Sequence, residues 1–94
     1  KWLPVGCARG DLIIDTGDMM ARITNGVIPA TTHRVVNPDG PNISRYSMPF
    51  FLQPRSDVML DCIAACSDAR APLPPITAGD YLNQRLREIG LPGA

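Results

Sequence analysis

His33 is the only histidine of the chain, and Arg45 and Ser47 follow it in the segment THRVVNPDGPNISRYS. An imidazole nitrogen can bind a divalent metal or move a proton, whereas a guanidinium beside a hydroxyl is suited to holding a carboxylate. Structural roles are equally open at this stage. A single histidine on an apolar strand is often a satisfied core or rim residue, and an arginine that alternates with a serine can lie on a solvated strand face.

The two runs that carry these residues are β-prone and are separated by turn-forming residues. HRVVN and RYSMPFFL flank PDGPNI, residues 38–43, so the simplest prediction is a β-hairpin. In that hairpin His33 lies across from residues 46–48, and Arg45 and Ser47 share one face because strand side chains alternate. Whether His33 shares their face depends on a register that the sequence does not fix, since a slip of one residue inverts it.

Further short elements are predicted on both sides of the hairpin. DLIID (11–15) has the composition of a buried strand, and DVMLDC (57–62) could form a further short strand. Between DLIID and the hairpin, GDMMARITNG has apolar residues at helical spacing, with Asp18 as a possible N-cap. The pair Asn25 and Gly26 predicts a stop or a turn at its end.

The C-terminal third predicts a proline-rich connection over residues 67–76 and a helix over residues 78–89. Thr77 is placed to cap this helix, with Asp80 three residues on, and Gly90 is placed to end it. One side of the helix is polar and the other carries an apolar stripe, which favours packing on a neighbouring element. The stripe consists of Tyr81, Leu82, Leu86 and Ile89.

The composition is that of one small domain without a charge excess. The chain has 94 residues, 45% of them hydrophobic, and its nine basic residues balance its nine acidic ones. A neutral chain lacks the electrostatic footprint of a protein that binds nucleic acid or an anionic membrane surface. No apolar run approaches the roughly 20 residues of a membrane span. The three cysteines match neither a disulfide framework nor a metal motif, which favours reduced, buried thiols and a cytoplasmic location.

The combination of GDMMARITNG, THRVVNP and RYSMPFFLQP resembles the non-haem iron, 2-oxoglutarate-dependent dioxygenases of the isopenicillin N synthase-like superfamily. The resemblance runs from about Trp2 to about Leu86. It implies a mainly β fold, part of a double-stranded β-helix (jelly roll) with a C-terminal α-helix, in which strands occupy roughly residues 1–62. It also implies that residues 1–94 are the C-terminal portion of the catalytic domain.

The same resemblance implies roles for the three residues considered first. His33 occupies the distal histidine position of the Fe(II) site, and Arg45 with Ser47 occupies the Arg-x-Ser positions that hold the far carboxylate of 2-oxoglutarate. The family's iron is held by two imidazoles and one carboxylate, so the missing His-x-Asp pair is expected in the remaining N-terminal part of the same protein. Asp15 or Asp18 could supply a carboxylate in principle, although Asp18 is assigned to the turn or to the helix cap.

Three classes of function therefore remain open. The first is a fragment, inactive by itself, of an oxygenase that oxidises a small organic substrate with O₂ and 2-oxoglutarate, giving succinate and CO₂. The second is a fragment of a related oxidase in which Arg45 grips the substrate's own carboxylate, as in isopenicillin N synthase. The third is a non-catalytic jelly-roll binding domain. The sequence does not identify the substrate, because selectivity depends largely on variable loops.

Overall fold

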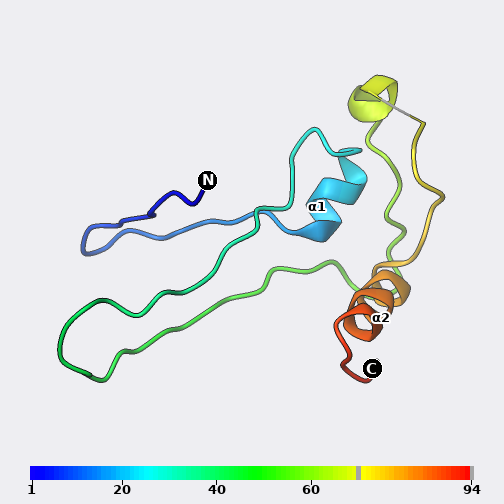
Figure 1. The fold of residues 1–94 in the computed structure, drawn as a ribbon. Helices are drawn as coiled ribbons and strands as arrows, with labels where there is room; N and C mark the ends of the chain where they lie inside the picture. The colour runs from blue at the N-terminus through cyan, green and yellow to red at the C-terminus, as the bar shows by residue number, and fades with distance from the viewer. Residues whose placement is uncertain (70, 94) are drawn as a thin grey trace.

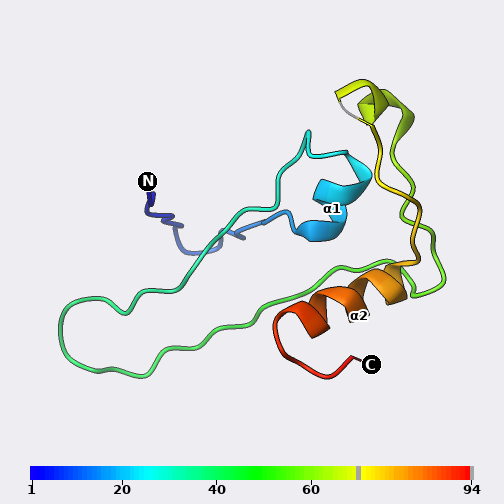
Figure 2. The same ribbon diagram turned by 45° about the vertical axis from the view of Figure 1, so that its right-hand side comes forward.

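The computed structural model describes residues 1–69 and 71–93, and three helical elements lie in them. The helices α1 (Asp18–Ile23) and α2 (Ala78–Glu88) are α-helical, and η1 (Ala64–Ala69) is a 3₁₀-helix. All three gather at one end of the molecule, and the N-terminal segment and a long loop extend away from them (Figures 1 and 2).

No β-strand occurs in the described residues, so the expected mainly β, jelly-roll fold with strands over residues 1–62 is wrong for this structure. The β-type pairing found there is an isolated antiparallel bridge between Met59 and Thr77. Residues 33–37 and 45–52 form the two legs of a loop (Figure 2), but no backbone hydrogen bond joins them. A two-stranded hairpin is marginal in water without a third strand or a helix against its apolar face, and here nothing covers that face.

The short helix α1 ends as predicted and begins differently. Its N-cap is Gly17, in an extended conformation, and Asp18 is the first helical residue instead of the cap. An acidic residue in the first turn interacts favourably with the positive end of the helix dipole, so Asp18 still suits its place. Asn25 and Gly26 take positive φ angles of 52° and 81°, which turns the chain out of the helix.

The helix α2 is defined by its cap. The Thr77 hydroxyl accepts a hydrogen bond from the Asp80 amide (3.1 Å) and donates one to Asp80 Oδ2 (2.7 Å), which confirms the predicted capping pair. At the other end Gly90 has a φ of 79°, where a residue with a side chain would be strained. The predicted apolar stripe is half-buried at Tyr81, Leu82 and Leu86. Its fourth residue, Ile89, is 66% exposed.

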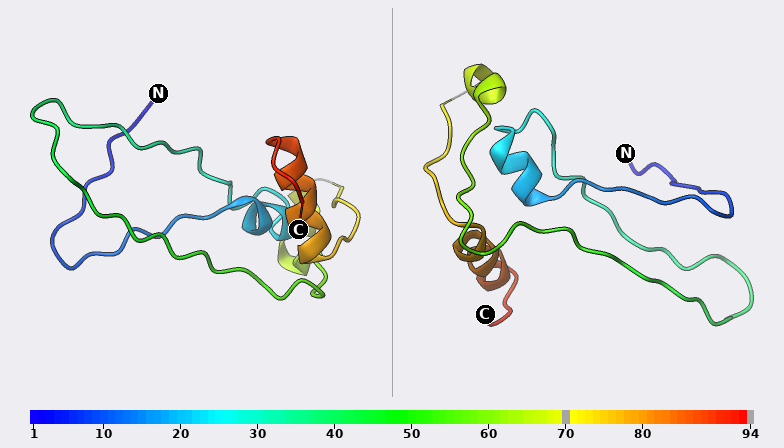
Figure 3. Two further views of the ribbon diagram at one scale, coloured as in Figure 1. Left: turned by 90° about the horizontal axis from the view of Figure 1, so that it is seen from below. Right: turned by 180° about the vertical axis from the view of Figure 1, so that it is seen from behind.

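The molecule divides into two regions, seen also from below and from behind in Figure 3. The helical region contains α1, η1, α2 and the chain that connects them, and it consists of residues 18–28, 56–69 and 71–93. The open arm contains the N-terminal segment and the long loop, and it consists of residues 1–17 and 29–55. Every residue of the open arm except Thr16 and Ala30 is exposed.

Two segments of the helical region hold each other through their backbones. The Leu60 amide donates to the Ile76 carbonyl, and the Ala78 amide donates to the Val58 carbonyl, both at 2.8 Å. Leu60 is 4% exposed and Ala78 is 2% exposed, and these are the buried apolar residues of the described chain. The start of α2 is therefore fixed against the segment that precedes η1.

Contacts from α1 complete the helical region. The Arg22 guanidinium lies 4.9 Å from the centre of the Tyr81 ring and donates to the Pro74 carbonyl at 2.5 Å. The Ile63 amide donates to the Ile23 carbonyl at 2.8 Å, so the chain before η1 is tied to the end of α1. A cation over an aromatic face adds roughly 0.5–1 kcal/mol at exposed sites.

The open arm gives the molecule an extended shape. The radius of gyration is 16.6 Å, whereas about 12 Å is expected for a compact chain of this length. The accessible surface is 8467 Å², compared with about 5,300 Å² for a folded monomer of the same mass. Large apolar side chains account for part of the excess, since Ile14 and Phe50 are each 89% exposed and Leu52 is 88% exposed.

The three cysteines are free thiols, but they are less buried than expected. Cys7 is exposed, and Cys62 and Cys66 are half-buried. The expectation of buried thiols fails most clearly at Cys7 because it lies in the open arm, where nothing packs on it. In the part of the chain that the structure describes, no helix is both long and apolar enough to cross a membrane.

Candidate functional site

His33 lies in the open arm, and one of its two ring nitrogens is engaged. Its Nδ1 atom is 2.9 Å from Asp15 Oδ2 and 2.9 Å from the Thr31 carbonyl oxygen. The side chain of His33 is 74% exposed, and that of Asp15 is 37% exposed. The ring is therefore held on one edge by two oxygen atoms, and most of the side chain is accessible.

The backbone explains why Asp15 and His33 meet. The Thr31 amide donates to the Thr16 carbonyl at 3.2 Å, and the Thr16 hydroxyl donates to the Pro29 carbonyl at 3.0 Å. These two bonds hold the segment before α1 against the segment that leaves the helical region. Asp15 directly precedes Thr16, and His33 follows Thr31 by two positions, so the crossing places their side chains together.

A polar turn after α1 produces this crossing. The Thr24 hydroxyl donates to the Met20 carbonyl at 2.7 Å and accepts from the Ile28 amide at 3.1 Å. The Asn25 side chain donates to the Cys66 carbonyl at 3.3 Å. Thr24 is only 3% exposed and Asn25 only 4% exposed, a burial that their polar side chains gave no reason to expect.

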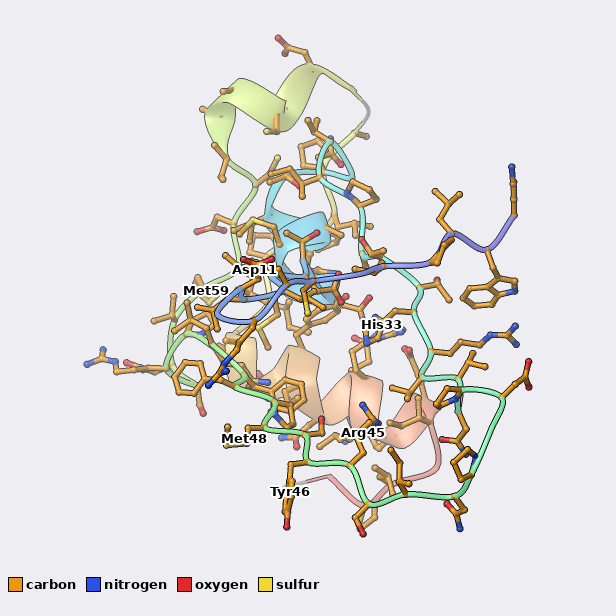
Figure 4. All side chains as sticks on the ribbon, turned by 90° about the vertical axis from the view of Figure 1, so that its left-hand side faces the viewer. Asp11, His33, Arg45, Tyr46, Met48 and Met59 are labelled. Carbon is orange, nitrogen blue, oxygen red and sulfur yellow. The ribbon has the colours of Figure 1, made fainter. Side chains whose placement is uncertain are left out.

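The other two predicted site residues lie on the second leg of the loop. Arg45 and Ser47 are exposed, and Arg45 borders a hollow lined otherwise by residues of the 37–44 turn. Figure 4 shows His33 on one leg and Arg45 on the other. Among residues 1–69 and 71–93, no hydrogen bond or ion pair joins His33 to Arg45 or Ser47. The structure thus puts all three in the open arm without joining them into one site.

The described residues do not form a metal site by themselves. No group of three histidine, cysteine, aspartate or glutamate side chains gathers there. Asp15 faces His33, and the Asp18 carboxylate accepts from Arg85 Nε at 2.9 Å in the helical region. The Asp18 charge and this hydrogen bond raise the pKa of Arg85 above its ordinary value. The donor set therefore fits one imidazole ligand, and sequence reasoning missed the Asp15 contact because it depends on the backbone crossing.

The family model described as the 2OG-Fe(II) oxygenase superfamily matches residues 1–54. This range contains His33, Arg45 and Ser47, and it is almost the whole of the open arm together with α1. The match ends before η1 and α2, so it falls mainly on the exposed part of the molecule.

Individual relatives match nearly the whole chain. The chain is 32% identical over 90 residues to kihadalactone A synthase of Citrus sinensis, and the match covers 94% of this chain and 26% of that protein. It is 33% identical over 89 residues to a 2-oxoglutarate-Fe(II) type oxidoreductase of Aspergillus fumigatus, covering 93% and 26%. It is 30% identical over 91 residues to isopenicillin N synthase of Streptomyces clavuligerus, covering 94% and 26%. The chain thus spans about a quarter of the length of these relatives, and no solved structure matches it.

Proposed function

Because the chain belongs to the 2OG-Fe(II) oxygenase superfamily, which uses Fe(II) and 2-oxoglutarate, we propose that it is part of an oxygenase acting on a small organic molecule. The complete enzyme hydroxylates or desaturates its substrate with O₂ and converts 2-oxoglutarate to succinate and CO₂. Residues 1–94 are the C-terminal portion of its catalytic domain. The observation that carries the proposal is the family match over residues 1–54, the range that contains His33, Arg45 and Ser47.

We assign His33 to the iron as one imidazole ligand. Its accessible ring suits this role, since a 74% exposed side chain is free to meet a metal. Bound iron supplies the O₂-activating chemistry, and a site of two imidazoles and one carboxylate leaves coordination positions open for it. The second histidine and the carboxylate come from other residues of the same protein, in keeping with a chain that spans about a quarter of its relatives.

Arg45 and Ser47 bind the distal carboxylate of 2-oxoglutarate. The guanidinium of Arg45 carries a permanent positive charge and a planar fork of donors that matches a carboxylate in two parallel hydrogen bonds. The Ser47 hydroxyl adds one donor beside it. Both residues are exposed in the structure and accessible to a ligand. Their task is to fix the co-substrate's orientation relative to the metal, which reduces the entropic cost of reaction.

The 94-residue chain alone is inactive under this proposal. A single imidazole does not hold a labile divalent metal against water, and the described residues contribute no group of three ligands. We expect the purified chain to form no succinate above a metal-free control when it is supplied with Fe(II), 2-oxoglutarate and O₂. Succinate formation by this chain would contradict the assignment of the remaining ligands to other residues.

We also propose a cytoplasmic location and small-molecule partners. Cys7, Cys62 and Cys66 are free thiols, which suits a reducing compartment. The formal net charge is zero, which gives no attraction for nucleic acid or for an anionic membrane surface. Fractionation of cells that express the complete protein tests the location.

The substitution Arg45→Ala in the complete protein tests the proposed function. In the complete site with 2-oxoglutarate bound, the proposal makes Arg45 and the carboxylate a buried, hydrogen-bonded charge pair. Removing one partner of such a pair costs about 2 to 5 kcal/mol, so 2-oxoglutarate affinity should fall roughly 30-fold to several thousand-fold. Arg45→Lys should restore only part of the loss, because an ammonium lacks the planar fork. The measurement is the apparent 2-oxoglutarate affinity at saturating Fe(II) and substrate.

Arg34→Ala is the matched control. Arg34 lies in the same arm, but its guanidinium lies 4.3 Å from the centre of the Trp2 ring, so its removal should leave 2-oxoglutarate affinity unchanged. Equal losses in Arg45→Ala and Arg34→Ala would mean that the arm responds to charge in general. Unchanged affinity in both variants would leave the non-catalytic alternative standing.

A related oxidase is the second candidate, and the similarity to isopenicillin N synthase favours it. In this alternative Arg45 and Ser47 grip a carboxylate of the substrate itself. The same variants separate the two candidates. Arg45→Ala would then weaken binding of the substrate, and turnover of the wild-type enzyme would not require 2-oxoglutarate.

A further inference from the structure

We propose that Asp15 is a positioning residue for His33, holding the imidazole in the tautomer that leaves Nε2 free to bind the metal. The inference rests on the proposed function, because it takes His33 as the iron ligand. It adds a residue that acts through His33 and has no contact with the metal itself.

The contacts of Nδ1 determine the tautomer. Two oxygen atoms lie 2.9 Å from Nδ1, the Thr31 carbonyl oxygen and Asp15 Oδ2. A carbonyl oxygen and the oxygen of an ionised carboxylate accept hydrogen bonds and donate none. A bare Nδ1 lone pair facing two oxygen atoms would be repelled by both. Nδ1 therefore carries the hydrogen, and in the neutral ring Nε2 carries the lone pair that a metal needs.

The two acceptors are themselves fixed by the fold. The Thr31 backbone is held by the hydrogen bond from its amide to the Thr16 carbonyl, and Asp15 directly precedes Thr16. The Thr16 hydroxyl is bonded to the Pro29 carbonyl, which closes the crossing on its other side. Thr16 is also one of the two residues in the open arm that are not exposed. The crossing thus gives an otherwise exposed ring a fixed edge.

Asp15 adds a negative charge that the Thr31 carbonyl does not have. A carboxylate that accepts from the far nitrogen of a metal-binding histidine orients the ring and makes its other nitrogen a better ligand. The opposite assignment, Asp15 as a metal ligand beside His33, conflicts with the contact, because Oδ2 is directed at Nδ1 and not at an open position next to Nε2.

The test is an anaerobic Fe(II) titration of the complete protein at fixed pH, with the unfolding midpoint of the metal-free protein measured in parallel. Removal of such a partner costs about 10- to 100-fold in metal affinity, so Asp15→Ala should weaken Fe(II) binding by that factor. Asp15→Asn should lose less, since the amide oxygen still accepts from Nδ1 without the charge. Asp39→Ala, which removes an exposed carboxylate from the tip of the same arm, is the matched control and should bind as wild type.

Unchanged midpoints together with a graded loss of affinity, Ala greater than Asn, support the positioning role. The inference is overturned if Asp15→Ala and Asp15→Asn bind Fe(II) as wild type does while His33→Ala has lost binding, and the proposed function then survives. It is also overturned if Asp15→Ala loses binding as completely as His33→Ala, which would make Asp15 a ligand, or if both Asp15 variants lower the midpoint of the metal-free protein. If His33→Ala binds Fe(II) as tightly as the wild-type protein does, the proposed function itself is refuted.

Discussion

The helical region and the open arm use opposite means to place their side chains. In the helical region, backbone hydrogen bonds, a capped helix and buried Leu60 and Ala78 fix the chain. In the open arm nearly every residue is exposed, and the order around His33 comes from one backbone crossing. The residues that the proposed function assigns to the iron and to 2-oxoglutarate, His33, Arg45 and Ser47, all lie in the arm, the part of the chain with the least packing.

The contrast shows what the arm lacks. Exposed residues such as Ile14, Phe50 and Leu52 would lose unfavourable contact with water if other residues of the protein covered them, at about 25 cal/mol per Å² of apolar surface. The accessible surface of the chain is 8467 Å², whereas a folded monomer of the same mass is expected to expose about 5,300 Å². Under the proposed function we expect other residues of the protein to cover the arm and to complete the site.

The largest effect is expected at His33, the residue that the proposed function assigns to the iron. His33→Ala in the complete protein should reduce Fe(II) affinity and iron-dependent turnover by more than the about 100-fold that loss of an outer partner costs. Stability of the metal-free protein should change much less, because a metal ligand contributes more to the metal site than to the packing of the core. Fe(II) titration and urea unfolding of the metal-free protein measure the two quantities. A variant that unfolds easily without metal but still binds Fe(II) would make His33 a structural residue.

The sequence predicted what depends on near neighbours. The Thr77 and Asp80 cap and the stop at Asn25 and Gly26 involve residues at most three positions apart, so their chemistry is visible in the sequence. Strands depend on partners far along the chain, so β-prone runs such as HRVVN and RYSMPFFL form none where no partner pairs with them. The jelly-roll expectation came from the family resemblance, and it is wrong for this structure for the same reason.

The candidate site divides in the same way. The residue types of His33, Arg45 and Ser47 made them candidates, since metal and carboxylate ligands come from few kinds of side chain, and the family resemblance assigned their roles. The contact between Asp15 and His33 could not be predicted, because it follows from the crossing of two extended segments. The sequence offered Asp15 only as a carboxylate that could in principle serve the metal, and it gave no signal for the contact with His33.

The contrast between the helical region and the open arm can be tested with the same leucine-to-alanine change made once in each region. Leu60→Ala in the complete protein should cost about 2–5 kcal/mol, because Leu60 is 4% exposed and its removal leaves a cavity. Leu52→Ala removes the same side chain from the open arm, where it is 88% exposed. Both free energies of unfolding come from urea titrations.

The cost of Leu52→Ala decides whether the contrast persists in the complete protein. A cost close to that of Leu60→Ala would show that other residues cover the arm, as we expect. A cost within about 0.5 kcal/mol of zero would show that the arm remains exposed. Leu60→Ala costing as little would contradict the assignment of Leu60 to a core.

The smallest effect is expected from the ion pair that links α1 to α2. Arg85 Nε lies 2.9 Å from Asp18 Oδ2, and the two side chains are 43% and 44% exposed. Exposed pairs contribute little, so Arg85→Gln should destabilise the metal-free protein far less than Leu60→Ala. Asp18 raises the pKa of Arg85. A raised pKa contributes stability that is complete below the ordinary arginine value and is lost only as pH rises through the folded value, so the effect should be constant near neutral pH.

Salt separates this charge effect from packing. Arg87→Gln is the matched control, because it removes the same charge from the same last turn of α2. At low salt Arg85→Gln should lower the urea midpoint more than Arg87→Gln does. At 1 M salt, where the screening length falls to about 3 Å, the difference between the two midpoints should shrink. A difference that persists at high salt would mean that Arg85 acts through the packing of its aliphatic stem, and the helical region would then be held by contacts between side chains in place of charge.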